Sequence, residues 1–243
     1  ELPFILKELE ADFKKELLGE RLLSTPKHYA YLKISEGCNR TCSFCAIPLM
    51  RGTHVSKPIE DILTEARHLV KNGVKEIMLI AQELTYYGLD LYKKRALAEL
   101  LDQMAQIEGL TWIRLHYAYP TKFPMEILEV IRKHDNICNY LDIPLQHCSN
   151  KMLKAMKRQI TRQEMIDLIG KIREEVPGIA IRTTMITGFP GETEEDVEDM
   201  KAFLEEMQFE RVGIFTYSHE ENTSAYELED TLSSEEKEKR AQE

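Results

Sequence analysis

Short apolar, β-branched runs alternate along the chain with amphipathic stretches of helical period. The runs that predict strands are 29–35, 76–82, 111–117, 140–146, 180–188 and 211–218. The stretches that predict helices are 58–71, 96–107, 124–133, 162–175 and 193–207, the last with Thr193 at its start. Strands that alternate with helices form right-handed βαβ units. We therefore predict an α/β fold with a parallel sheet of six strands.

Several predicted strands carry a polar residue at every second position. These residues are Arg114, His116, Asp142, Gln146, Arg182 and Thr184. A parallel sheet covered on both faces is apolar almost throughout, whereas alternation is typical of a barrel with helices outside and a polar interior. The pattern favours a barrel or partial barrel that contains a ligand-sized cavity. A doubly wound sheet remains possible, with the polar groups paired at strand ends.

The two ends differ from the middle of the chain. Residues 1–24 form a charged helical pattern, which predicts a linker or packing helix. Residues 25–232 hold all the predicted strands and form the core domain. Residues 233–243 are almost all charged or polar and predict the start of a helix in a truncated C-terminal segment. Because the chain begins with Glu1 rather than Met, we expect it to be a fragment of something longer.

Composition narrows the functional classes. The 243 residues are 43% hydrophobic, without a run near the roughly 20 apolar residues of a membrane span and without a signal peptide. The formal net charge of −10 repels phosphate backbones and suits a basic protein partner. The five cysteines are odd in number and unevenly spaced, which favours a reducing, cytoplasmic compartment and thiols used for metal binding or catalysis.

Three cysteines lie within eight residues, directly after the first predicted strand. Cys38, Cys42 and Cys45, at spacings of four and three, can bind three corners of an iron–sulfur cube and leave one iron without a protein ligand. A structural zinc site needs four ligands, and His28 or His54 could supply the fourth. Spacing therefore favours the cluster and leaves zinc open. Loops that follow barrel strands build active sites, so we expect this loop at the barrel mouth.

This CxxxCxxC motif, with Phe44 before its last cysteine, resembles the radical S-adenosylmethionine (SAM) superfamily. The resemblance implies a partial (open) six-stranded parallel β/α barrel and a [4Fe–4S] cluster on Cys38, Cys42 and Cys45. It also implies that SAM chelates the open iron and is split by one electron, supplied by a donor such as flavodoxin or ferredoxin. The cofactor then performs the radical chemistry, while the protein ligates, orients and excludes water.

Further motifs resemble the methylthiotransferases of this superfamily, which insert a methylthio group at a C–H bond. They lie at 36–40, 45–52, 142–147, 156–158 and 187–193. Residues 81–88, 114–120 and 211–218 are similar to the branch that modifies the β-carbon of an aspartate in a small-subunit ribosomal protein. The resemblance implies that protein, or the ribosome, as the substrate. The branch that modifies a tRNA adenosine is the alternative, which the acidic charge disfavours.

The resemblance also implies SAM-binding residues. Phe44 would lie against the adenine, Gln82 would bind the methionine amino group, and Gln146 would bind ribose hydroxyls. Arg182 or Arg158 would hold the methionine carboxylate. Ordinary structure offers alternatives for these residues: an aromatic that packs, a solvated amide at a strand end, or an arginine at a helix C-terminus. A further set of side chains is expected to face substrate or to close the barrel mouth: His116, Tyr117 and Tyr119.

The sequence departs from the family pattern in several ways. Methylthiotransferases of this kind carry an N-terminal domain with a second cluster and a C-terminal β-barrel, and neither is recognised in this sequence. Cys138 and Cys148 do not match the ligands of that second cluster, so we interpret them as ordinary thiols. Lys57 stands where the family usually has Arg. A zinc-stabilised binding barrel without catalysis is the remaining alternative function.

Overall fold

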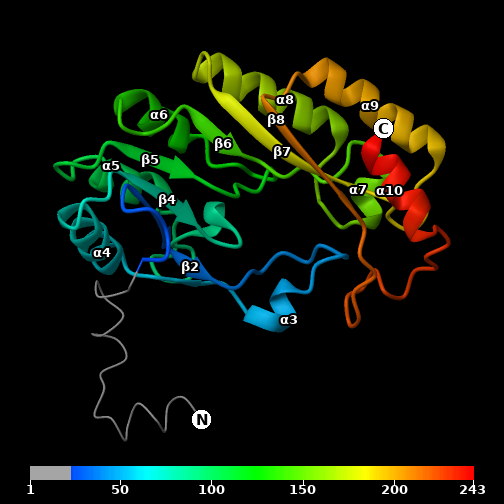
Figure 1. Cartoon of the computed structure of the whole chain (residues 1–243), viewed down its shortest axis with the longest axis horizontal. Helices are drawn as coiled ribbons and strands as arrows, with labels where there is room; N and C mark the ends of the chain where they lie inside the picture. Colours follow the sequence, from blue (N-terminus) through cyan, green and yellow to red (C-terminus); the bar gives the residue numbers. More distant parts are fainter. Residues whose placement is uncertain (1–22) are drawn as a thin grey trace, which may run out of the picture.

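The computed structural model describes residues 23–243 (Figure 1). The linker or packing helix predicted for 1–24 falls, except for its last two residues, outside the described residues. Six strands run parallel in chain order: β1 (Tyr29–Lys33), β4 (Glu76–Ile80), β5 (Trp112–Leu115), β6 (Tyr140–Asp142), β7 (Ala180–Thr187) and β8 (Arg211–Thr216). All the predicted strands exist, although each ends earlier than the sequence pattern indicates.

The six strands form one curved, open sheet. β1, β4 and β5 pair as one group, and β6, β7 and β8 pair as another. A parallel bridge between Ile113 and Ile137 joins the groups, and the Cys138 backbone N–H donates to the Ile113 carbonyl at 2.9 Å. Among the described residues β1 and β8 do not pair, so the barrel is partial, as predicted.

Helices cover the outer side of the sheet (Figure 1). The predicted ones are α4 (Ile59–Lys71), α5 (Leu97–Met104), α6 (Glu126–Lys133), α8 (Arg162–Glu175) and α9 (Glu194–Met207). α8 and α9 begin at capping boxes, in which Thr161 pairs with Glu164 and Thr193 pairs with Asp196. The segment 233–243 contains a helix, α10 (Ser234–Gln242), which contacts β7 and β8.

Several short elements were not predicted. They are the antiparallel hairpin of β2 (Ser35–Glu36) and β3 (Val55–Ser56), the helices α3 (Ile47–Arg51) and α7 (Asn150–Ala155), and the 3₁₀ turn η1 (Leu84–Tyr86). Segments this short cannot display a period of 2 or 3.6. All of them lie in connections that follow β1, β4 or β6, and these connections shape the barrel mouth.

The alternation along the strands separates two environments. Apolar residues such as Ile113, Leu141 and Ile181 are almost fully buried in the main core. The intervening polar residues Arg182 and Thr184 are half-buried on the opposite face. The core is therefore one-sided, as the alternation predicts. Within residues 23–243, no helix combines the length and the apolar character needed to cross a bilayer.

Candidate metal centre

The cysteine loop, residues 37–46, connects β2 to α3. Gly37 starts the loop at φ +77°, and a Cβ there would collide with the carbonyl oxygens of Gly52 and Thr53. The Cys38 backbone N–H donates to the Gly52 carbonyl at 3.1 Å. Only glycine fits this approach without strain. The hairpin therefore fixes the direction in which the loop, and its three thiols, leave the sheet.

All three thiols of the cysteine loop line one cavity of about 270 Å³, here termed the inner cavity. Its lining residues are Cys38, Arg40, Cys42, Phe44, Cys45, Ile47, Gln82, Tyr117 and Tyr119. The predicted site residues Phe44 and Gln82 are thus brought to the cysteines. Tyr117 and Tyr119, which were expected at the mouth, also lie here. Concave walls with a few convergent polar groups are typical of a cofactor site.

The chemistry of the thiols fits an iron–sulfur cluster. Cys38 is buried, and this burial raises the pKa of its thiol to about 11; burial also raises the pKa of Cys45. Thiols in such surroundings keep their protons until a metal displaces them, and thiolates are the ligands that hold iron–sulfur clusters. The three sulfur donors around one cavity are therefore a ligand set that suits a cluster with one open iron.

The two histidines considered for a zinc site are held elsewhere. His54 Nε2 lies 3.2 Å from Ser56 Oγ, and the His54 ring is not part of the inner cavity. His28 precedes β1, whereas the cysteine loop follows the other end of that strand. Because a structural zinc site needs a fourth ligand, this arrangement favours the three-cysteine cluster over zinc.

Arg158 lies against the cysteine loop. Its side chain is fully buried, and its Nη1 donates to Cys42 Sγ at 3.3 Å while Nη2 donates to the Pro144 carbonyl. The guanidinium carbon also lies 4.2 Å from the centre of the Tyr119 ring. α7 ends at Ala155, so Arg158 is not a helix C-terminal residue. The structure thus places a buried positive charge beside one predicted metal ligand.

A second buried arginine was missed at the level of sequence. Arg40 pairs with Glu83 at 2.7 Å and lies between the rings of Tyr86 and Tyr119, at 4.0 and 3.8 Å from their centres. Glu83 also accepts from the Thr85 backbone N–H at 2.8 Å. Arg40 stands inside the cysteine motif and Glu83 at the end of a predicted strand, but no local pattern links residues 43 positions apart. The pair ties the cysteine loop to the end of β4.

Gln82 and Gln146 each hold a buried amide oxygen that has no partner among the described residues. Gln82 Nε2 donates to Glu36 Oε1 at 3.0 Å, which leaves its oxygen available beside the inner cavity. Gln146 has φ +77° and is 5% exposed, but it does not line the inner cavity. Arg182 lies on β7 opposite Asp142 and outside that lining. Buried polar atoms without partners are typical of ligand-binding positions.

The remaining cysteines lie away from the inner cavity. Cys148 is fully buried, and burial raises the pKa of its thiol to about 12; its Sγ donates to Asp199 Oδ2 at 3.6 Å. Cys138 is half-buried, and burial raises its pKa as well. All five cysteines are free thiols. These surroundings agree with the interpretation of Cys138 and Cys148 as ordinary thiols.

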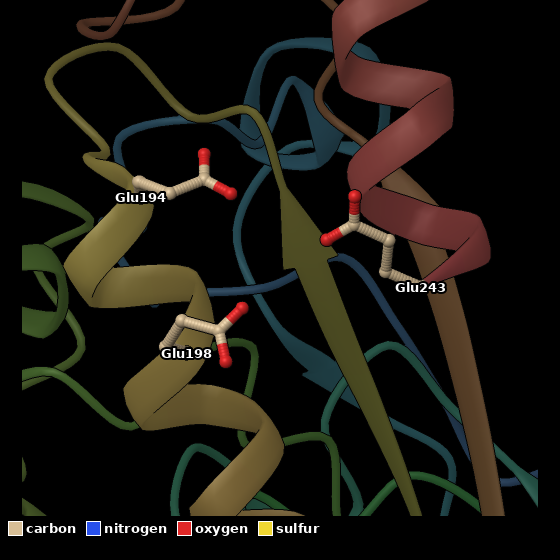
Figure 2. A group of neighbouring side chains, drawn as sticks. All are labelled: Glu194, Glu198 and Glu243. Atoms are coloured by element: carbon tan, nitrogen blue, oxygen red, sulfur yellow. The ribbon is translucent and has the colours of Figure 1, made fainter.

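One group of carboxylates lies close enough together to hold a cation, but it is exposed. Figure 2 shows Glu194 and Glu198 on α9 facing Glu243, the last residue of the chain. The Lys201 ammonium donates to Glu198 and to Glu243, at 2.7 Å in both cases. A lysine therefore already balances part of this negative charge, and the group gives no reason to infer a metal.

Comparison with known proteins is consistent with this geometry. The radical SAM superfamily pattern matches residues 32–204. The ribosomal protein uS12 methylthiotransferase RimO of Flavobacterium johnsoniae is 63% identical over 243 residues, which are 100% of this chain and 56% of that protein. The RimO protein of Bacteroides fragilis is 55% identical over 240 residues, covering 98% of this chain and 56% of its own length. The chain thus spans little more than half the length of these curated relatives.

Solved structures share the fold at low sequence identity. Coproporphyrinogen III oxidase (HemN) of Escherichia coli, described as a radical SAM enzyme, has a TM-score of 0.65 and 17% identity. The match covers 88% of this chain and 50% of HemN. The radical SAM methyltransferase TsrM of Kitasatospora setae has a TM-score of 0.66 and 17% identity, over 81% of this chain and 39% of TsrM.

Proposed function

The chain belongs to the radical SAM superfamily, and from this premise we propose that it is the SAM-cleaving core of a methylthiotransferase. The proposed reaction adds a methylthio group to the β-carbon of an aspartate in ribosomal protein uS12. The observation that carries the proposal is the convergence of Cys38, Cys42 and Cys45 on one cavity. The uS12 methylthiotransferase of Flavobacterium johnsoniae, which is 63% identical over the whole chain, supports the choice of substrate.

In the proposed site Cys38, Cys42 and Cys45 would hold a [4Fe–4S] cluster. When bound and reduced, this group would supply the electron for the cleavage of SAM. The protein contributes ligation and exclusion of water, because Cys38 is buried and the other two thiols are half-buried. The Arg40–Glu83 pair keeps the cysteine loop against β4. A rigid loop of this kind holds the reacting groups in a fixed orientation.

We assign the SAM contacts to the predicted residues that carry suitable groups, two of which line the inner cavity with the cysteines. Phe44 and Gln82 line the inner cavity, and the free Gln82 amide oxygen suits the methionine amino group. The buried Gln146 amide oxygen suits a ribose hydroxyl. Arg182 is the preferred partner of the methionine carboxylate, because Arg158 already donates to Cys42 and to Pro144. Carboxylates favour guanidinium partners.

The proposed partners follow from the reaction and the charge. The formal net charge of −10 attracts a basic ribosomal protein, alone or in the ribosome, and repels tRNA. The two relatives cited above carry the uS12 name, so the tRNA alternative is not favoured. Turnover further requires a one-electron donor such as flavodoxin or ferredoxin. We expect the sulfur to come through a second cluster outside these residues, as the family resemblance implies.

Anaerobic reconstitution tests the proposed function. Residues 1–243 should bind four irons and four sulfides and, with dithionite and SAM, form 5′-deoxyadenosine and methionine. Without the expected second cluster they should leave uS12 unmodified, as mass spectrometry of the ribosomal protein would show. A chain that binds four irons and does not cleave SAM would overturn the SAM-cleaving core. Methylthiolation of uS12 by residues 1–243 alone would overturn the expected need for a second cluster.

A further inference from the structure

A pair of adjoining grooves shares Gln159, Ile160 and Glu164, and the first of them reaches the cysteine loop at Thr41. The first, of about 690 Å³, is lined by Thr41, Lys154, Lys157 and Gln159. The second, of about 420 Å³, shares Gln159 and adds Lys122 and Lys171. We call the two together the outer groove. Thr41 lines the outer groove and its neighbour Cys42 lines the inner cavity, so the cysteine loop is the wall between them.

The outer groove is basic, although the molecule as a whole is acidic. Its four lysines are exposed, and none forms an ion pair within residues 23–243. The acidic residues in its lining, Glu164 and Asp167, are engaged locally: Glu164 accepts from the Thr161 backbone N–H at 2.7 Å, and Asp167 accepts from Gln163 at 2.8 Å. The outer groove thus carries four lysine charges against two carboxylate charges, on a chain of net charge −10.

The segment that carries two of these lysines also holds the cysteine loop. The Ser43 backbone N–H donates to the Met156 carbonyl at 3.0 Å, and Ser43 Oγ donates to the Ala155 carbonyl at 2.8 Å. Arg158, the residue after Lys157, donates to Cys42 Sγ. One face of this short segment thus contacts a predicted cluster ligand, while Lys154 and Lys157 on the same segment are exposed. The segment 154–158 therefore connects the groove directly to the predicted ligand Cys42.

We propose that the outer groove is the docking surface for an acidic one-electron carrier of the flavodoxin class. This inference rests on the proposed function, because reductive cleavage of SAM consumes one electron per turnover. The anionic flavin hydroquinone of the carrier would pass one electron to the oxidised cluster and become the neutral semiquinone, without loss of a proton. Charge complementarity steers an acidic carrier to the groove, whereas the net negative charge of the chain repels it elsewhere.

Direct binding is the first test, and it needs no cluster. Calorimetric titration of the full chain with an acidic bacterial flavodoxin should give binding that weakens as salt rises. The variant K154E/K157E should weaken binding by about tenfold or more at low salt. The matched control K71E/K75E makes the same charge change around a different groove, lined in part by Lys71 and Lys75, and should bind as the wild-type chain does. K154Q/K157Q, with the charges removed, should be intermediate.

Reduction of the reconstituted cluster is the second test, followed by stopped-flow absorbance. Flavodoxin hydroquinone should reduce K154E/K157E more slowly than the control variant, while dithionite should reduce both equally. Thermal melting by circular dichroism establishes that both variants are folded. If dithionite reduces the cluster but SAM is not cleaved, the proposed function fails while the docking result stands.

Three outcomes would overturn the docking proposal. The first is equal flavodoxin binding by K154E/K157E and K71E/K75E. The second is equal rates of cluster reduction by flavodoxin in the two variants. The third is displacement of flavodoxin by a short RNA duplex that binds the wild-type chain more tightly, which would assign the groove to nucleic acid.

Discussion

At the scale of single residues, Arg158 makes two separate contacts at the candidate site. Arg158 is a buried cation that lies against the thiol of Cys42 and also satisfies the Pro144 carbonyl. A guanidinium group suits this position because its N–H donors lie in one plane and can reach both acceptors at once. The charge and the fork are separable: a positive charge alone could face Cys42, whereas the fork also fixes the loop that follows β6 through the Pro144 carbonyl.

Replacing Arg158 tests this division. R158K keeps the charge but loses the fork, so one buried acceptor loses its partner, and we expect a loss of about 1–3 kcal/mol in the free energy of unfolding. Urea denaturation of the cluster-free chain measures it. R173K is the matched control, because Arg173 donates to the carbonyls of Met207 and Gln208 at a more exposed position. Equal losses in R158K and R173K would contradict the special position of Arg158.

The cysteines permit a sharper prediction. C38A, C42A and C45A should each reduce reconstituted iron from four atoms per chain to background, because a [4Fe–4S] cluster held by two thiolates is not retained. Iron and sulfide analysis under anaerobic conditions measures this. C138A should keep the full iron content, since Cys138 does not line the inner cavity. Iron at the wild-type level in any one of the three variants would remove that cysteine from the ligand set.

At the scale of elements, α10 is attached to the loop after β7 by a buried carboxylate. Glu192 Oε1 accepts from Arg240 of α10 at 2.8 Å and from the Gly188 backbone N–H at 2.9 Å. Its other oxygen lies 3.4 Å from His147 Nε2, and the His147 and Glu192 side chains are fully buried. The C-terminal helix therefore packs on the mouth side of the fold and supports the loops after β6 and β7.

Replacing Arg240 should leave the buried Glu192 carboxylate without its positively charged partner. R240M should lower the free energy of unfolding by about 3–5 kcal/mol, because Glu192 would then be desolvated and only partly neutralised. K239M, at an exposed position of the same helix, should change it by less than about 0.5 kcal/mol. Urea denaturation of the two variants measures this difference. Similar midpoints would mean that α10 contributes little to the fold.

Sequence patterns predict the long helices and strands and miss the short ones. Both outcomes depend on how many residues an element contributes to a periodic pattern. α8 has the predicted bounds because a capping box and four helical turns all lie within one local segment. The β2–β3 hairpin has two residues in each strand, so no period exists to detect. In the site, the three cysteines lie within eight residues, so their spacing alone predicts a ligand set. The Arg40–Glu83 pair and the Arg158 contact connect distant segments, and only the folded chain reveals them.

At the scale of the whole molecule, buried thiols make stability depend on pH. Burial raises the pKa of Cys148 to about 12, whereas an unfolded thiol titrates near 8.5. Between these values the folded chain binds more protons than the unfolded chain, so stability is complete below about pH 8.5 and falls as pH rises. Cys38, with a pKa of about 11, acts in the same direction in the cluster-free chain.

The expected fall in stability with rising pH can be measured on the cluster-free chain. The free energy of unfolding, from urea denaturation, should decline between pH 8.5 and pH 10.5. C148A should decline less steeply over the same interval, because one buried thiol no longer contributes. C138A is the control for the chemistry of the substitution, since Cys138 is only half-buried whereas Cys148 is fully buried. Parallel pH curves for the wild-type chain and C148A would contradict the prediction.

The contact between Arg158 and Cys42 also has a consequence for biosynthesis. The two residues are 116 positions apart, so the contact cannot form until most of the sheet has been translated and folded. The three cysteines, by contrast, are translated before Arg158 and within eight residues of one another. A nascent chain therefore exposes all three predicted metal ligands before the barrel can select the metal. Loading of the correct cluster is expected to follow translation, after any metal captured by the unfolded loop has been exchanged.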